Sequence, residues 1–350
     1  MSNKIGLMKW DGMRTSSINT TYSGVEFDVA KSALQKYIRR GITEKALLVA
    51  VEIYRLKEVG GDAAVSNLCN RLALIAVEDV GAANLSLVTD VVRVLEDGAR
   101  DLPTILAIVQ LLCLSDKTRM MSHCWRAYAT KEGRTVSTAA GIALDISFTP
   151  EDIVYVQRYK NCQLFMSGDS DNLQWYALMF LKRMQERDLN AFSWAHFYLE
   201  ASVNVTVARR RKFITGNSRN VTGKPDIILW KMLSTVLPPN VHDTLVSAYY
   251  NHAENRPFLQ CAILAALYNT TYTPTSLLTV AITWQTNEEM TKMVRGDYQL
   301  VVDDYVIDKH TRLGRLQHKT IKDFVEEGAV VHPQSTLFYN EQLAELYKRR

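Results

Sequence analysis

The stretch ITEKALLVAVEIYRLKE, residues 42–58, decides the fold class of this chain. Its apolar side chains recur about one helical turn apart, as at Leu47 and Val51, which is the pattern of an amphipathic α-helix. Most of its other residues favour helices, and Thr43 is the predicted N-cap. Gly41 separates this helix from a preceding one that carries Leu34 and Ile38.

The same helical period continues along most of the chain, and only eight prolines and sixteen glycines interrupt it. Because short turns place successive helices antiparallel, the sequence predicts an all-α, multi-helix bundle. The further predicted helices lie within residues 63–79, 86–97, 102–116, 151–165, 171–187, 192–212, 226–236, 242–253, 257–268 and 340–350.

Breaks in the helical period indicate a domain organisation. The C-terminal extension is less regular than the rest, and residues 298–315 could hold one short strand or an ordered tail. The expected parts are a flexible N-terminal arm at 1–25, a helical domain at 26–132, a linker at 133–150, a second helical domain at 151–270 and the extension at 271–350.

The two helical domains could be degenerate copies of one unit. A shift of 137 positions lays residues 112–127 over 249–264 and matches Cys124 with Cys261. A shift of 127 lays residues 41–56 over 168–183, so the ten-residue difference would be one insertion between helices. The identities are few, and chance similarity between amphipathic helices is the alternative.

Composition narrows the class of protein. The 41 basic and 37 acidic residues give a net charge of +4, which allows a polyanionic partner without demanding one. No uninterrupted apolar run approaches the roughly 18 to 20 residues that span a bilayer, and the N-terminus lacks a signal-peptide core. The five cysteines include no Cys-x-x-Cys pair and the seven histidines are scattered. We therefore expect a reduced intracellular protein, in the cytoplasm or nucleus, with no metal and no membrane partner.

Residues 26–130 carry a family resemblance, which covers a little less than a third of the chain. After a two-helix unit they contain an Arg-Leu-x-x-Ile-Ala-x-Glu-Asp-Val-Gly run from Arg71 to Gly81. This run resembles a signature in the C-terminal helical domain of clamp-loader-related AAA+ ATPases, in the group of replication-associated recombination protein A and the Werner-helicase-interacting proteins. The resemblance implies a non-catalytic oligomerisation collar, and hence a homo-oligomer.

No ATPase module is apparent beside this collar-like domain. The nearest approach to a phosphate loop is GNSRNVTGKPD, residues 216–226. Its glycines are too far apart, and Pro225 stands where Ser or Thr would bind magnesium. We therefore expect no ATP hydrolysis, no cofactor and no enzymatic activity.

Glu78 and Asp79 directly follow an apolar run, so catalysis, metal binding and a structural role are all candidates. Arg71 precedes Glu78 by two helical turns on the same face, and Asp79 or Asn84 can cap the helix that follows. A cap or a buried ion pair is the preferred interpretation.

The sharpest functional signal is a basic segment, ARRRKFITGNSRNVTGKP, which we define as residues 208–225. It contains no acid; its cations suit phosphate oxygens, and an aromatic among them suits unpaired bases. A solvated loop and a protein-binding loop are the alternatives. The predicted nucleic-acid-binding residues in this segment are Arg209, Arg210, Arg211, Lys212, Phe213, Arg219 and Lys224.

A second basic cluster lies within residues 308–322, where the predicted nucleic-acid contacts are Arg312, Arg315 and Lys319. Acids on both sides dilute its field, so solvated surface is the alternative. Together these patterns predict a non-enzymatic protein that binds DNA or RNA in replication, recombination or genome packaging, with a virus as one setting and replication or packaging proteins as further partners. The competing prediction is an adaptor that binds other protein subunits through its helical faces.

Overall fold

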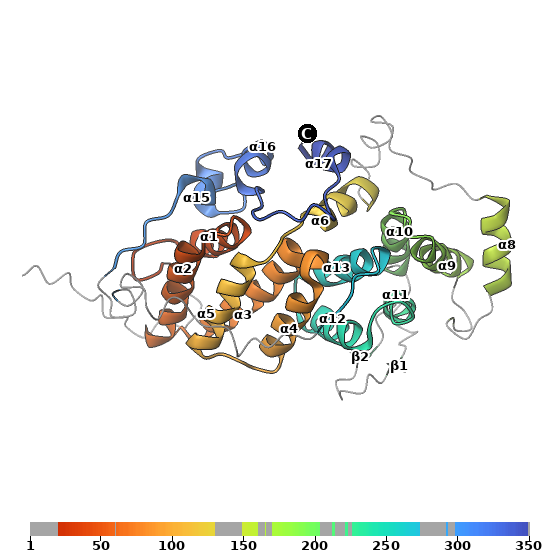
Figure 1. Ribbon diagram of the computed structural model, residues 1–350, viewed down its shortest axis with the longest axis horizontal. Coiled ribbons are helices and arrows are strands. Elements are labelled where there is room, and N and C mark those ends of the chain that lie inside the picture. The colour runs from red at the N-terminus through yellow and green to blue at the C-terminus, as the bar shows by residue number, and fades with distance from the viewer. Residues whose placement is uncertain are drawn as a thin grey trace, which may run out of the picture.

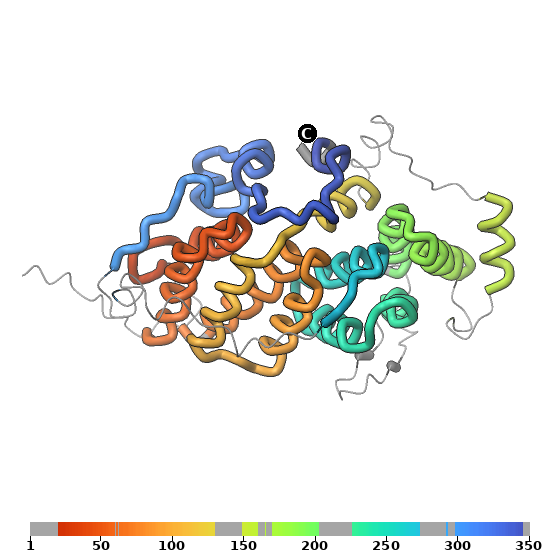
Figure 2. Tube along the Cα trace, viewed as in Figure 1, coloured from red at the N-terminus to blue at the C-terminus, as the bar shows by residue number. Residues whose placement is uncertain are grey.

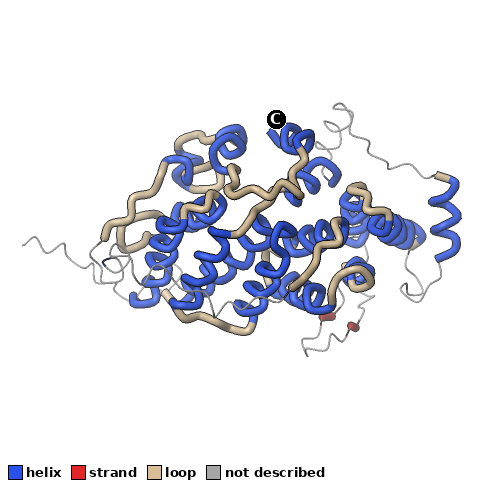
Figure 3. Tube along the Cα trace, in the orientation of Figure 1, coloured by secondary structure: helices blue, strands red, loops and turns tan. Residues whose placement is uncertain are grey.

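The fold of this chain is taken from a computed structural model. It describes residues 20–59, 61–129, 149–159, 165, 170–203, 212–213, 221–222, 226–273, 292 and 298–348. The predicted all-α class is confirmed, since helices make up nearly all the regular structure of these residues (Figure 3). The exception is a pair of two-residue strands, β1 (Lys212–Phe213) and β2 (Val221–Thr222), which run antiparallel.

The first half of the chain is a succession of short helices. Its elements are α1 (Phe27–Arg39), α2 (Thr43–Arg55), η2 (Leu56–Val59), α3 (Asp62–Ile75), η3 (Ala76–Val80), η4 (Gly81–Asn84), α4 (Leu85–Glu96), α5 (Leu102–Leu114), α6 (Met120–Cys124) and η5 (Trp125–Ala129). The elements η3 and η5 are π-helical turns.

The predicted turn between the first two helices is present, and Gly41 has the positive φ of +68° that glycine adopts without strain. The predicted cap at Thr43 is wrong. Ile42 holds the N-cap position and no side chain caps α2, because Thr43 is already the first helical residue. Further along, Asn84 does cap α4 by accepting the Leu87 amide at 3.1 Å, which confirms one of the two predicted caps.

The second half has the same kind of succession. Its helices are α8 (Pro150–Tyr159), α9 (Asp171–Gln185), α10 (Ala191–Val203), α11 (Ile227–Leu233), α12 (Pro239–Asn251) and α13 (Arg256–Leu267). The buried apolar residues of both halves form one continuous cluster. Polar contacts also join the halves, since Glu96 of α4 accepts from Asn251 at 2.6 Å and lies 3.0 Å from His252 at the end of α12.

The helix bounds can be compared with the two sequence shifts. The C-terminal ends of α4 and α5, shifted by 137 positions, coincide with those of α11 and α12. The shift of 127 is not reproduced: α2 shifted by 127 spans 170–182, whereas α9 is Asp171–Gln185, and α3 ends where α10 ends only with a shift of 128. The duplication of a helical unit stays a prediction.

The C-terminal extension folds back over the first half. Its described part, residues 298–348, we call the C-terminal strap. The strap crosses α1 and α6 (Figures 1 and 2), so its residues lie over helices that are distant in sequence. Its elements are η8 (Asp304–Val306), α15 (Arg312–Leu316), α16 (Ile321–Asp323), η9 (Phe324–Gly328) and α17 (Glu341–Lys348). Of the two expectations for residues 298–315, an ordered tail is confirmed.

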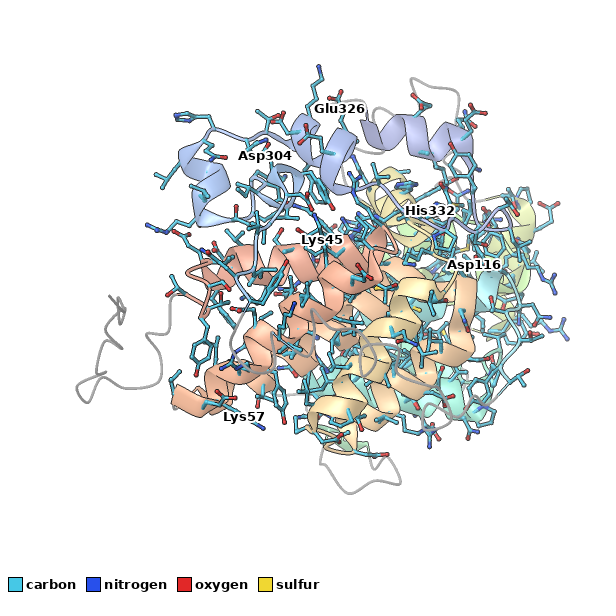
Figure 4. The ribbon with its side chains drawn as sticks, turned by 60° about the vertical axis from the view of Figure 1, so that its left-hand side comes forward. Lys45, Lys57, Asp116, Asp304, Glu326 and His332 are labelled. Carbon is cyan, nitrogen blue, oxygen red and sulfur yellow. The ribbon has the colours of Figure 1, made fainter. Side chains whose placement is uncertain are left out.

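Backbone hydrogen bonds fasten the middle of the strap. The Lys117 amide donates to the Pro333 carbonyl at 3.0 Å, and the Ser335 amide donates to the Lys117 carbonyl at 2.8 Å. The His332 amide donates to the Arg39 carbonyl at 2.8 Å, and Figure 4 shows His332 beside the loop that follows α5. The expected N-terminal arm also becomes ordered before residue 25, because Ser23 donates to Glu52 at 2.8 Å.

Candidate functional site

The basic segment lies between α10 and α11. The described part of it is the antiparallel strand pair, in which Lys212 pairs with Thr222 and Phe213 pairs with Val221. The predicted contacts Arg209, Arg210, Arg211, Arg219 and Lys224 lie outside the described residues, as do the side chains of Lys212 and Phe213.

The net positive charge of the chain comes from this segment. It holds six of the 41 basic residues and none of the 37 acidic ones. The remaining chain therefore has 35 basic and 37 acidic residues, a formal net charge of −2. The eighteen residues of the basic segment therefore account for the whole positive excess of the protein.

The second predicted cluster has its cations in contact with the protein's own acids and carbonyls. Arg312 forms an ion pair with Glu26, and its backbone amide donates to Asp28 at 2.6 Å. Arg315 donates to the His310 carbonyl at 3.0 Å. The Lys319 ammonium lies 3.1 Å from Asp304 and 3.8 Å from Glu327.

These contacts leave the second cluster a weaker attractor for anions than its sequence indicates. The Arg312 side chain is still 66% exposed, so a polyanion could reach it. Its positive field is reduced by the carboxylate that it holds, as are the fields around Lys319. Arg315 alone of the three makes its described contact with a neutral group.

The acidic pair of the signature-like run lies in the π-helical turn η3. Asp79 is fully buried, and its carboxylate receives Nε of Arg39 at 2.7 Å. Nη1 of Arg119 approaches the same carboxylate at 3.4 Å, and Nε2 of Gln35 donates to it at 3.1 Å. Burial alone would raise the pKa of Asp79, but the two guanidinium groups outweigh it and hold the pKa below its usual range.

A buried ion pair is thus present, but it is made by Asp79, the predicted candidate for a cap, and not by Glu78. Arg71, which the sequence places on the same face as Glu78, lies 4.0 Å from Glu254 in the turn before α13. Glu78 is half-buried and accepts from Gln35 at 2.8 Å. Burial raises the pKa of Glu78, and the neighbouring Asp79 charge raises it further.

This cluster links three parts of the fold. Arg39 also donates to the Gly328 carbonyl of the strap, and the Thr118 amide donates to the Asp79 carbonyl at 2.9 Å. Each charge therefore meets a partner within the protein, and Asp79 has no exposed face at which a substrate could bind. The arrangement holds the strap and the loop before α6 against α1, which is a structural role. Among the described residues, no group of three or more His, Cys, Asp or Glu side chains could hold a metal ion.

Sequence reasoning missed the cations that meet in this region. Lys36, Arg39, Lys117 and Arg119 are all buried. The Lys117 ammonium donates to the carbonyls of Cys113 and Ser115 at 2.7 and 2.8 Å and so completes the last turn of α5. Burial lowers the pKa of Lys117 to about 8. No sequence signal separates Lys36, Arg39 and Arg119 from surface cations, because their carboxylate partners lie far along the chain. The partners of Lys117 are local, but they are backbone carbonyls, which no residue type marks.

One described stretch, Ala63–Glu96, is long and apolar enough by composition to cross a membrane. It is four consecutive elements rather than one straight helix, since Gly81 turns the chain between η3 and α4. Most of it, 78% of the apolar window, is buried inside the fold, as expected for core helices. The four described cysteines, Cys69, Cys113, Cys124 and Cys261, are buried and free.

Comparison with known proteins does not extend these findings, since no family model, no curated protein and no solved structure matches this chain.

Proposed function

We propose that this protein is a non-enzymatic nucleic-acid-binding protein, a helical scaffold that presents the basic segment to DNA or RNA. The observation that carries the proposal is the charge distribution: the segment has six cations and no acid, whereas the rest of the chain is slightly acidic. Nucleic acids bind such segments by releasing counterions from their phosphates.

The position of the segment supports the same proposal. In the first half, the chain passes from the end of α3 to the start of α4 through residues 76–84, whereas the matching passage in the second half is residues 204–226. The longer passage joins helices that are themselves buried in the core. An extension that the helical core does not need for packing is the usual place for binding residues.

The biological setting follows from the resemblance alone. A chain related to a clamp-loader collar would oligomerise, and it would act in replication, recombination or genome packaging beside other proteins of that process. A virus is one setting for such a protein.

An adaptor is the second candidate, and exposed apolar side chains favour it. Leu114, Val154 and Leu337 are 64%, 64% and 72% exposed on the described surface. Single exposed apolar residues are common on monomers, so they carry less weight than the charge distribution.

Charge neutralisation separates the two candidates. The test variant replaces Arg209, Arg210, Arg211 and Lys212 with Ser and is compared with wild type for binding of a labelled oligonucleotide at moderate salt. We expect about a tenfold or greater loss of affinity, since several phosphate contacts disappear together.

A matched variant removes the same charge elsewhere. It replaces four scattered exposed cations with Ser, namely Lys57, Arg93, Arg158 and Lys322. We expect it to lose far less affinity than the test variant. Equal losses would show a dependence on net charge alone, and unchanged affinity in the test variant would favour the adaptor.

A further inference from the structure

Cations on α1 and α2 face the C-terminal strap. The Lys36 ammonium lies 2.7 Å from the Asp308 carboxylate and donates to the Val306 carbonyl at 2.9 Å. On α2, the Lys45 ammonium lies 2.6 Å from Asp303.

Arg40 completes this set from the last turn of α1. Its guanidinium lies 4.0 Å from the centre of the Tyr305 ring and donates to the Glu327 carbonyl at 2.5 Å. We call Lys36, Arg40 and Lys45 the strap-facing cations. Arg39, which lies between Lys36 and Arg40 in the sequence, forms its ion pair with Asp79 instead.

The segment that meets these cations resembles a polyanion in its chemistry. Residues 298–308, YQLVVDDYVID, contain three acids and no cation. They present carboxylate and carbonyl oxygens in succession to ammonium and hydroxyl groups, including Ser32, which donates to the Val306 carbonyl at 2.7 Å. Figure 4 shows Asp304 and Glu326 on the strap, with Lys45 on the helices below it.

Both polar and apolar contacts attach this segment. Leu300 and Val306 are buried, four partly buried side chains also pack against the core (Tyr298, Val302, Tyr305 and Ile307), and Val301 is 73% exposed. The Leu300 amide donates to the Ser23 hydroxyl at 2.7 Å, and the Asp303 amide donates to the Tyr37 hydroxyl at 3.0 Å. Phosphate oxygens can replace the carboxylate and carbonyl acceptors that the segment offers to Lys36, Arg40 and Lys45.

We propose that residues 298–308 are a built-in competitor, which occupies a nucleic-acid-binding face on α1 and α2 and leaves it when a phosphate backbone takes its place. The strap-facing cations are then a second contact surface beside the basic segment, so the inference rests on the proposed function. The rest of the strap stays attached through Lys117 and the buried Phe338.

The test uses a background in which Arg209, Arg210, Arg211 and Lys212 are Ser, so that binding reports the α1–α2 face. In this background Asp303→Asn removes the ion pair with Lys45 and so weakens the competitor, and the Asp303 carboxylate is exposed enough to spare the fold. A control carries Asp97→Asn, which removes equal charge from an exposed site elsewhere. We expect the Asp303→Asn variant to bind labelled oligothymidylate about fivefold tighter than the control, since an exposed ion pair contributes up to about 1 kcal/mol.

A second measurement needs no variant. Hydrogen exchange of the Leu300 and Asp303 amides should quicken when wild type is saturated with oligothymidylate, because release breaks both hydrogen bonds. Three results would each overturn the competitor proposal. They are unchanged exchange of these amides, equal affinities of the Asp303 variant and its control, and no binding by either of them. The proposed function fails by a different result, namely equal binding by wild type and the loop-neutralised background.

Discussion

Replacing Asp79 with Ala should be among the most damaging single changes in this protein. The substitution leaves Arg39 and Arg119 buried without the carboxylate that both approach. Removal of one partner from a buried ion pair typically costs about 3 to 5 kcal/mol, because the remaining charge stays desolvated. Here two cations lose their carboxylate, so we expect a loss of unfolding free energy within or above that range.

The neighbouring residue provides the matched control. Glu78 is half-buried and makes one described hydrogen bond, to Gln35. Its pKa is raised, so the fold disfavours its charged form, and removing it relieves repulsion of Asp79. Glu78→Ala should therefore cost about 1 kcal/mol or less. Two adjacent acids in the same turn thus have clearly different expected effects.

Urea denaturation followed by circular dichroism measures both losses. A double-mutant cycle with Arg39→Ala isolates the pair, and a coupling energy of about 1 to 3 kcal/mol is expected. Oligonucleotide affinity of the folded Asp79→Ala variant should stay within about twofold of wild type, because the cluster is structural. A loss below about 1 kcal/mol, or intact stability with lost binding, would refute this reasoning.

Three further predictions concern buried groups and the strap. The pKa of Lys117 is lowered to about 8 in the fold, so the unfolded state binds more protons than the folded state between about pH 8 and 10.4. In urea denaturation across that range, wild type should therefore gain stability relative to a Lys117→Met variant as the pH rises. Gly41→Ala should cost more stability than Gly98→Ala in the same assay, because both have positive φ but only at Gly41 would the added Cβ meet the His332 carbonyl at 3.0 Å; equal costs would show that the strap does not press on this turn. In a Cys162→Ser variant, a thiol reagent should label no cysteine of the folded protein at neutral pH, since burial raises the pKa of the four others; rapid labelling would contradict their placement in the core.

Local patterns made the helices predictable. The periodicity of residues 42–58 places α2 correctly, and the polar Asn84 after an apolar run identifies a cap. Thr43 misled because a threonine near a helix start can be either the cap or the first helical residue, and only backbone geometry decides between them.

Contacts between distant parts of the chain were not predictable in this way. Asp79 pairs with Arg39 and Arg119, each forty residues away, whereas the local pattern indicated only that Arg71 lies on the same face as Glu78. Residues 298–308 of the strap have no helical period, and their contacts with α1 and α2 include hydrogen bonds and ion pairs to residues more than 250 positions away. A single sequence does not reveal which cations such a segment will cover.

The salt dependence of wild-type oligonucleotide binding tests the central claim most directly. If four to six cations of the basic segment contact phosphates, the plot of log affinity against log salt should have a slope of about −3 to −5 between about 50 and 200 mM salt. The variant with Ser at positions 209–212 should have a slope closer to zero by about 3. A wild-type slope near zero, or a slope that the four substitutions leave unchanged, would contradict the account.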